Sequence, residues 1–209
     1  MSEAGRIRVL SVDDHPLVRE GIAAMINDQP DMQMVAQSSS GKEGIQSFRE
    51  HKPDIVLMDM RLPDMSGLDA MITIRSEFRD ARVIVLTSSE GDAEMRRALD
   101  GGARGYMLKS MPPKELLEAI RKVHAGKKAI PPEIAERLAN HYGDETLSDR
   151  EIEILQQVAE GNRNKDIADK LFISEGTVKV HLKHIMGKLG ANDRTQAITI
   201  AVRRGIIHL

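Results

Sequence analysis

Short apolar runs alternate with helical segments along the first 125 residues of this 209-residue chain. Each run is rich in β-branched side chains, and the segment after it has the 3.6-residue apolar spacing of a helix. The runs are Ile7–Val12, Met32–Ala36, Ile55–Met58, Val83–Leu86 and Gly105–Leu108. The helical segments are Leu17–Ile26, Lys42–Glu50, Leu68–Phe78, Ala93–Leu99 and Pro113–His124. Five such repeats predict an α/β domain with a parallel sheet covered on both faces.

The pattern changes after residue 125. Gly126 and the pair Pro131-Pro132 interrupt it, so we expect residues 126–146 to be a linker with one short helix near Glu133–Asn140. Beyond it the spacing is helical only, which predicts a small all-α domain over residues 147–209. The expected helices are one capped by Ser148 and ended by Gly161, then Asn164–Leu171, Ser174–Leu189 and Arg194–Arg204.

Charged or polar side chains follow several of the predicted strands. Asp13 and Asp14 follow the first, Asp59 the third, Thr87 the fourth and Lys109 the fifth. These positions converge if the strand order is the flavodoxin-like 2-1-3-4-5, because ligands bind beyond the carboxyl ends of parallel strands. Three carboxylates at one place repel one another unless a cation neutralises them, and an oxygen-preferring ion such as Mg²⁺ suits this set. The alternative is that each Asp caps a turn, that Thr87 is a strand residue and that Lys109 lies in solvent.

Five separated motifs in this region resemble the receiver domain of bacterial two-component response regulators. They occur in the receiver order and spacing, and the resemblance covers about residues 6–125. The motifs are Val12-Asp-Asp-His15, Leu57–Pro63, Ser66-Gly67, Leu86-Thr-Ser88 and Gly105–Lys109.

The resemblance implies a phosphoacceptor site. Asp59 would accept a phosphoryl group from a sensor histidine kinase. Asp13 and Asp14, with Asp59 and the backbone carbonyl of Arg61, would hold Mg²⁺ or Mn²⁺. Lys109 would pair with the phosphoryl oxygens as a point charge.

The resemblance also implies a switch. Thr87 would bond to the phosphoryl group and draw its loop inward, and Tyr106 would be the coupled aromatic residue. Tyr106 is otherwise an ordinary aromatic residue of the core or surface.

The segment Ser174–Leu189 carries a buried stripe and an unusual exposed face. Val178, Leu182, Ile185 and Leu189 recur at helical spacing and predict the stripe. The other face shows Lys179, Val180, Lys183, His184 and Lys188. A valine among lysines suits a helix in the DNA major groove, where it contacts a thymine methyl while the lysines reach guanine edges or phosphates. A surface helix with several lysines is the alternative.

The short helix predicted before this segment completes a helix-turn-helix layout. The stretch resembles the LuxR-type helix-turn-helix of the NarL/FixJ response regulators over about residues 145–207. The matching residues are Leu147–Glu151, Glu160-Gly161, Asn164-Lys165, Ile167-Ala168, Ile173-Ser174, Thr177–His181, Lys188-Leu189 and Arg194-Thr195.

The second resemblance implies that Lys179, Val180 and Lys183 face bases. Side chains at the groove edges or phosphates would be Thr177, His181, His184, Lys188, Asn164 and Lys165. A neutral His181 bonded within the fold and an Asn164 that caps its helix are the alternatives. The last helix would carry the dimer contact through Ala197, Ile198, Ile200, Ala201 and Val202, unless these only fill the core.

Together these features predict a transcription regulator and not an enzyme. Phosphorylation of Asp59 would favour a homodimer that binds double-stranded promoter DNA. The alternatives are a DNA binder whose receiver dimerises without phosphorylation, an adaptor that acts through protein contacts, and a small phosphatase that uses Asp59. The phosphatase is disfavoured because such enzymes often carry a second Asp two residues later, where this chain has Arg61.

Charge and hydropathy fit that reading. The net charge of the chain is −2, yet residues 163–209 hold nine Lys and Arg against four Asp and Glu. This local excess is modest, so DNA binding should be salt-sensitive and should depend on dimerisation.

The absence of Cys excludes a Cys-ligated zinc finger and a thiol nucleophile. With no long apolar segment and no signal peptide, we expect a cytoplasmic protein without a membrane partner.

Overall fold

The computed structural model describes residues 5–88, 91–132, 134–136 and 147–207. The chain divides into two compact units, of which the N-terminal one contains residues 1–89 and 95–135 and the C-terminal one contains residues 90–94 and 136–209. Each unit is described below by itself. In the described part of the chain, no helix is both long and apolar enough to cross a membrane.

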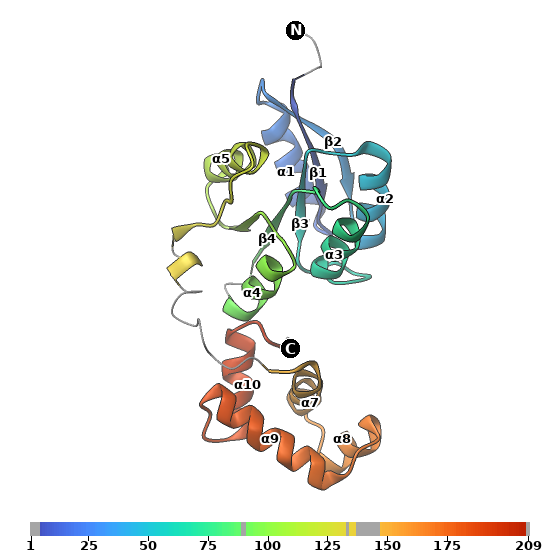
Figure 1. The fold of residues 1–209 in the computed structure, drawn as a ribbon, viewed down its shortest axis with the longest axis vertical. Helices are drawn as coiled ribbons and strands as arrows, with labels where there is room; N and C mark the ends of the chain where they lie inside the picture. Colours follow the sequence, from blue (N-terminus) through green and yellow to red (C-terminus); the bar gives the residue numbers. More distant parts are fainter. Residues whose placement is uncertain (1–4, 89–90, 133, 137–146, 208–209) are drawn as a thin grey trace. The chain divides into compact units, whose positions relative to one another are not determined.

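The N-terminal unit is built on a five-stranded parallel sheet of order β2-β1-β3-β4-β5, as predicted (Figure 1). The strands are β1 Ile7–Val12, β2 Met32–Ser38, β3 Ile55–Asp59, β4 Val83–Thr87 and β5 Gly105–Leu108. Every residue of β3 and β4 is buried, as expected for central strands. Strand β3 pairs with β1 on one side and with β4 on the other, which brings the residues after β1 and β3 to one edge.

Five helices cover the sheet. They are α1 Pro16–Asn27, α2 Gly41–His51, α3 Gly67–Glu77, α4 Asp92–Asp100 and α5 Pro113–His124. Ile22 and Ile26 of α1 share one apolar cluster with Leu116 and Ile120 of α5, so these two helices pack on the same face. The starts of α2 and α3 are fixed by Ser40 and Ser66, whose hydroxyls accept the backbone N–H three residues later.

The segment after α5 returns to the sheet and extends it. Ala129 forms a parallel bridge with Gly105. Its N–H donates to the carbonyl of Arg104 at 2.9 Å, and its carbonyl accepts from the N–H of Tyr106 at 3.0 Å. Ala129 is buried in the same apolar cluster as α1 and α5. The start of the predicted linker is therefore packed as part of the N-terminal unit, beyond the expected boundary at residue 125.

The rest of the linker is described only in part. Pro132 and residues 134–136 are helical, at the start of the short helix expected near Glu133–Asn140. The remainder of that predicted helix lies outside the described residues.

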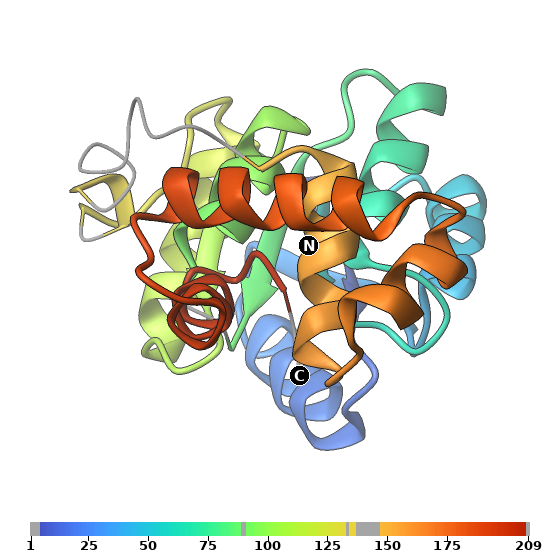
Figure 2. The same ribbon diagram turned by 90° about the horizontal axis from the view of Figure 1, so that it is seen from below.

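The C-terminal unit is helical, as predicted. Its helices are α7 Asp149–Ala159, α8 Asn164–Leu171, α9 Glu175–Leu189 and α10 Arg194–Arg203. The predicted capping box is present, because Ser148 accepts from the Glu151 N–H while the Glu151 carboxylate accepts from the Ser148 N–H. Figure 2 shows α8 leading through a short turn into the long helix α9. In that turn Phe172 adopts the left-handed conformation and Ser174 caps α9.

Candidate functional site

A largely buried lysine joins two buried aspartates at the carboxyl edge of the sheet. Asp13 follows β1, Asp59 ends β3 and Lys109 follows β5. The Lys109 Nζ lies 2.7 Å from Oδ2 of Asp13 and 2.7 Å from Oδ2 of Asp59. Both aspartate side chains are almost fully buried, and only 14% of the lysine side chain is exposed. The predicted convergence of these residues is thus present in the structure.

Burial and charge act against each other within this triad. Burial raises the pKa of Asp59, and the neighbouring Asp13 raises it further, while the hydrogen bond from Lys109 lowers it in part. Burial lowers the pKa of Lys109, but its bonds to Asp13 and Asp59 outweigh this, so the pKa lies above its ordinary value. Lys109 therefore remains a cation, and the protonation of Asp59 is sensitive to any further positive charge at the site.

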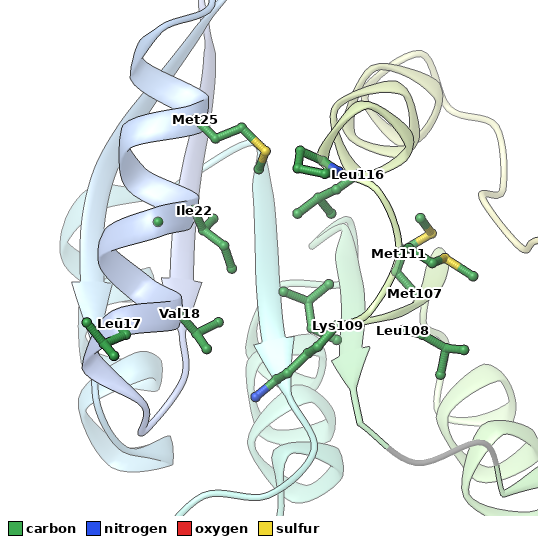
Figure 3. A pocket seen from close by; sticks show the side chains of 12 residues that line it. Leu17, Val18, Ile22, Met25, Met107, Leu108, Lys109, Met111 and Leu116 are labelled. Atoms are coloured by element: carbon green, nitrogen blue, oxygen red, sulfur yellow. The ribbon is translucent and has the colours of Figure 1, made fainter.

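An apolar cavity of about 350 Å³ lies beside the lysine, between α1 and the start of α5 (Figure 3). Val18, Ile22, Met25 and Leu116 line it, together with the stem of Lys109. In Figure 3 the lysine amino group points away from these side chains, toward the carboxyl end of β3. The apolar wall thus supports the stem while the charged end reaches the aspartates.

Asp14 and His15 add further donors on the exposed side of the site. The side chain of Asp14 is 38% exposed, and the His15 Nδ1 lies 2.7 Å from its Oδ1. One donor atom from each of Asp13, Asp14, His15 and Asp59 lies within 4.8 Å of the others. Three carboxylates in this arrangement fit an oxygen-preferring divalent cation. The sequence reasoning assigned no role to His15, although its place directly after the Asp pair was visible.

Backbone groups of the loop after β3 lie against Asp59. The Arg61 N–H is directed at Asp59 Oδ1, at 3.4 Å, while the metal contact predicted for the Arg61 carbonyl stays a prediction. Gly67 donates its N–H to the Met60 carbonyl at 2.9 Å. A Cβ at Gly67 would lie 1.9 Å from the Asp59 carbonyl oxygen, so no larger residue fits this backbone. The sequence reasoning used Gly67 only as part of a motif.

The two predicted switch residues are both buried. Thr87 ends β4, and its carbonyl accepts from the Lys109 N–H at 2.8 Å. Tyr106 lies in β5 opposite Val85 and is one of the largest fully buried side chains in the described part of the chain. The structure therefore places Tyr106 in the interior. Its coupling to Thr87 stays a prediction.

In the C-terminal unit, α9 has the two faces that the sequence predicts. Val178, Leu182, Ile185 and Leu189 are buried in the core of the unit. Val180 is 54% exposed on the other face. Lys179 is also exposed and pairs with Glu175, one turn earlier, at 2.7 Å. Lys183 and His184 are exposed as well.

Lys188 was expected on the exposed face of α9, but it forms an ion pair that is largely buried. Its Nζ lies 2.8 Å from Oε2 of Glu151, and only 24% of the lysine side chain and 6% of the glutamate side chain are exposed. Near the end of α9, this lysine turns toward the body of the unit because a buried carboxylate on α7 attracts it. The pair joins α9, the helix predicted to contact DNA, to α7, the helix whose start carries the capping box.

The remaining predicted contact residues lie near the starts of α8 and α9. Lys165 is exposed in the first turn of α8. Asn164 is the first residue of α8 and not its cap, because the cap position belongs to Arg163, whose N–H donates to Asp166. The Thr177 hydroxyl lies 2.8 Å from that of Ser174. His181 is half-buried.

The apolar residues of α10 contribute to the core. Ala197 and Ala201 are buried, while Ile198, Ile200 and Val202 are partly buried against the same cluster. The core-packing alternative accounts for these contacts, and a dimer contact through this helix stays a prediction.

The Glu151 pair predicts how the C-terminal unit responds to acid. Burial raises the pKa of Glu151, but its bonds to Lys188 and Ser148 outweigh this and hold the pKa below its ordinary value of 4.5. A group with a depressed folded-state pKa stabilises the fold above its unfolded value, and this stabilisation is lost as pH falls through the folded value. The unit should therefore lose stability as pH falls below about 4.5.

Thermal unfolding of wild type and Glu151→Gln, each at about pH 7 and about pH 3.5, checks this dependence. The variant should be less stable at the higher pH and should lose less on acidification. An equal acid-induced loss in both proteins would contradict the assignment to Glu151.

Two families match the two units. Residues 9–121 match the response regulator receiver domain, and residues 145–201 match the bacterial regulatory proteins of the luxR family. The chain is a response regulator of the LuxR family. Its receiver domain contains the triad of Asp13, Asp59 and Lys109, and its DNA-binding domain contains α8 and α9.

Several known proteins resemble this response regulator over most of its chain. The response regulator protein VraR of Staphylococcus aureus is 39% identical over 206 residues, which are 96% of this chain and 99% of the relative. A LuxR-family response regulator from Aurantimonas sp. SI85-9A1 is 39% identical, with a TM-score of 0.63 over 66% of this chain and 98% of that one. RcsB from Salmonella enterica serovar Typhimurium, solved bound to a promoter with the phosphomimetic BeF₃⁻, is 27% identical. Its TM-score is 0.72, over 93% of this chain and 97% of the RcsB chain.

Proposed function

We propose that phosphorylation of Asp59 by a sensor histidine kinase controls promoter binding by this regulator. The observation that carries the proposal is the bridge from Lys109 to Asp13 and Asp59, at 2.7 Å to each. A lysine held charged beside a buried carboxylate compensates the negative charge that a phosphoryl group brings. Phosphoryl transfer depends mainly on such positioning and charge neutralisation.

Each residue of the site has a place in this proposal. The carboxylate of Asp59 attacks the phosphorus of the donor, and the bond from phosphorus to the donor breaks. Asp13 and Asp14, with Asp59 and the backbone carbonyl of Arg61, would hold Mg²⁺ or Mn²⁺. The cation supplies positive charge to the phosphoryl oxygens and favours the ionised form of Asp59, whose pKa burial raises.

The switch would run through the strand ends. Lys109 would keep its bond to Asp13 and turn its second bond from Asp59 to a phosphoryl oxygen. Thr87 would bond to another phosphoryl oxygen and draw its loop inward, with Tyr106 as the coupled aromatic residue. The new charge would shift the population towards a homodimer that binds DNA.

The DNA contacts of the proposal come from the exposed face of α9. Lys179, Val180 and Lys183 would face base edges in the major groove. Contacts to phosphates or groove edges would come from Thr177, His181, His184, Asn164 and Lys165. Because Lys188 pairs with buried Glu151, we assign it to the positioning of α9. A dimer would read two half-sites related by two-fold symmetry. With a kinase and a promoter as its partners, the regulator would act in the cytoplasm.

The test is a binding measurement with four arms. Affinity for a promoter fragment selected from genomic DNA is measured for wild type and Asp59→Asn, each with and without acetyl phosphate and Mg²⁺. We expect acetyl phosphate to strengthen binding by wild type about tenfold, in the range typical of coupled sites, and to leave the variant unchanged. Equal affinities in all four arms would instead favour a DNA binder whose receiver acts without phosphorylation. Catalytic turnover of a phosphate ester, beyond one equivalent per chain, would favour an enzyme.

A further inference from the structure

His15 stands at a helix start without capping the helix. It occupies the N-cap position of α1, yet its side chain makes no cap hydrogen bond. The Nδ1 atom is instead directed at the aspartate pair, 2.7 Å from Asp14 Oδ1 and 3.2 Å from Asp13 Oδ1. The His15 N–H also donates to Asp13 Oδ1, at 2.9 Å, which fixes the residue beside that oxygen.

The oxygens of the aspartates face two different partners. Lys109 takes Oδ2 of Asp13 and Oδ2 of Asp59. The Oδ1 atoms of Asp13 and Asp14 lie on the side of His15. A cation that uses carboxylate oxygens not already bonded to the lysine would therefore meet the imidazole nitrogen among its nearest donors.

We propose that His15 is a nitrogen ligand of the cation site. The site then offers a mixed set of carboxylate oxygens and one imidazole, in place of oxygens alone. Imidazole suits Co²⁺, Ni²⁺ and Zn²⁺ better than Mg²⁺, which prefers oxygen and keeps its waters. The site therefore binds transition-metal ions more tightly than an all-oxygen site does. This inference rests on the cation site of the proposed function.

Binding of Co²⁺ and of Mg²⁺ to the full chain tests the proposal, by calorimetry and by the visible absorption of bound Co²⁺. The variants are His15→Gln and, as matched control, His124→Gln, which removes an exposed imidazole at the end of α5. Loss of even an outer-shell partner commonly weakens metal binding by 10- to 100-fold, so His15→Gln should weaken Co²⁺ binding by about tenfold or more. It should change Mg²⁺ binding by less than about threefold. The Co²⁺ absorption should shift in His15→Gln and stay as in wild type in His124→Gln.

Two results would overturn the ligand role. Equal Co²⁺ affinity and absorption in wild type and His15→Gln would show that the imidazole does not reach the ion. An equal loss of Mg²⁺ and Co²⁺ affinity would show that His15 acts only by positioning Asp14. Failure of the proposed function would be seen in a different measurement. Acetyl phosphate would then leave wild-type DNA binding unchanged, whereas the Co²⁺ measurements test the ligand role of His15 without any phosphodonor.

Discussion

Replacing Gly67 by alanine is expected to destabilise the receiver domain by about 3 kcal/mol, the upper end of the usual overpacking range. The added methyl group would lie 1.9 Å from the Asp59 carbonyl oxygen and 3.0 Å from the Met60 Cα. Both are main-chain atoms, so no side-chain rotation can relieve the clash. The end of β3 must move, and Asp59 moves with it. We therefore expect phosphorylation by acetyl phosphate to slow as well.

Gly21→Ala is the matched control for this change. Gly21 lies in α1, and a Cβ built there meets nothing within 4 Å. Alanine in a helix interior should stabilise the domain by roughly 0.5 to 1 kcal/mol relative to glycine. Scanning calorimetry of the full chain compares the receiver transition in the three proteins. If the receiver domain of Gly67→Ala unfolds at the same temperature as that of wild type, the backbone after β3 accommodates the added methyl group without cost.

The combined change Lys179→Ala and Lys183→Ala is expected to weaken promoter binding by roughly 100-fold, since each base-reading contact is typically worth about 1–3 kcal/mol. Both lysines stand on the exposed face of α9 beside Val180. Lys179 already pairs with Glu175 and must exchange that partner for DNA. The single change Lys183→Ala should therefore account for the larger share of the loss.

Fluorescence anisotropy with labelled promoter and non-specific duplexes, at several salt concentrations, checks this prediction. If the lysines read bases, the specific duplex should lose more affinity than the non-specific one. If they contact phosphates, both should weaken and the salt dependence should fall by about one ion per lysine. Lys114→Ala, at an exposed position in α5 of the receiver domain, is the control and should bind as wild type does. Unchanged promoter affinity in the double variant would exclude this face of α9 from the interface.

Sequence reasoning located the strands because the alternation of apolar runs and helical segments is a local pattern. Their order was taken from the flavodoxin-like arrangement common among parallel α/β sheets. It placed Asp13, Asp59 and Lys109 together because strand ends of a parallel sheet share an edge. The pairing of Lys188 with Glu151 lay beyond it, since a lysine on an exposed-looking helix position gives no sign of a buried carboxylate 37 residues away. The need for glycine at position 67 could not be predicted either, because the close approach of Gly67 to the Asp59 backbone arises only when the loop after β3 is folded.

The pairing of Ala129 with β5 bears on how the receiver domain is isolated for study. A fragment ending at residue 125 would lack the segment that satisfies the Arg104 carbonyl and the Tyr106 amide. Its outermost strand would then present free backbone groups, and such an edge recruits a strand from a second copy. Self-association of so short a fragment would report the missing segment and not the phosphorylated state. A fragment that retains residues through Ala135 keeps that edge covered.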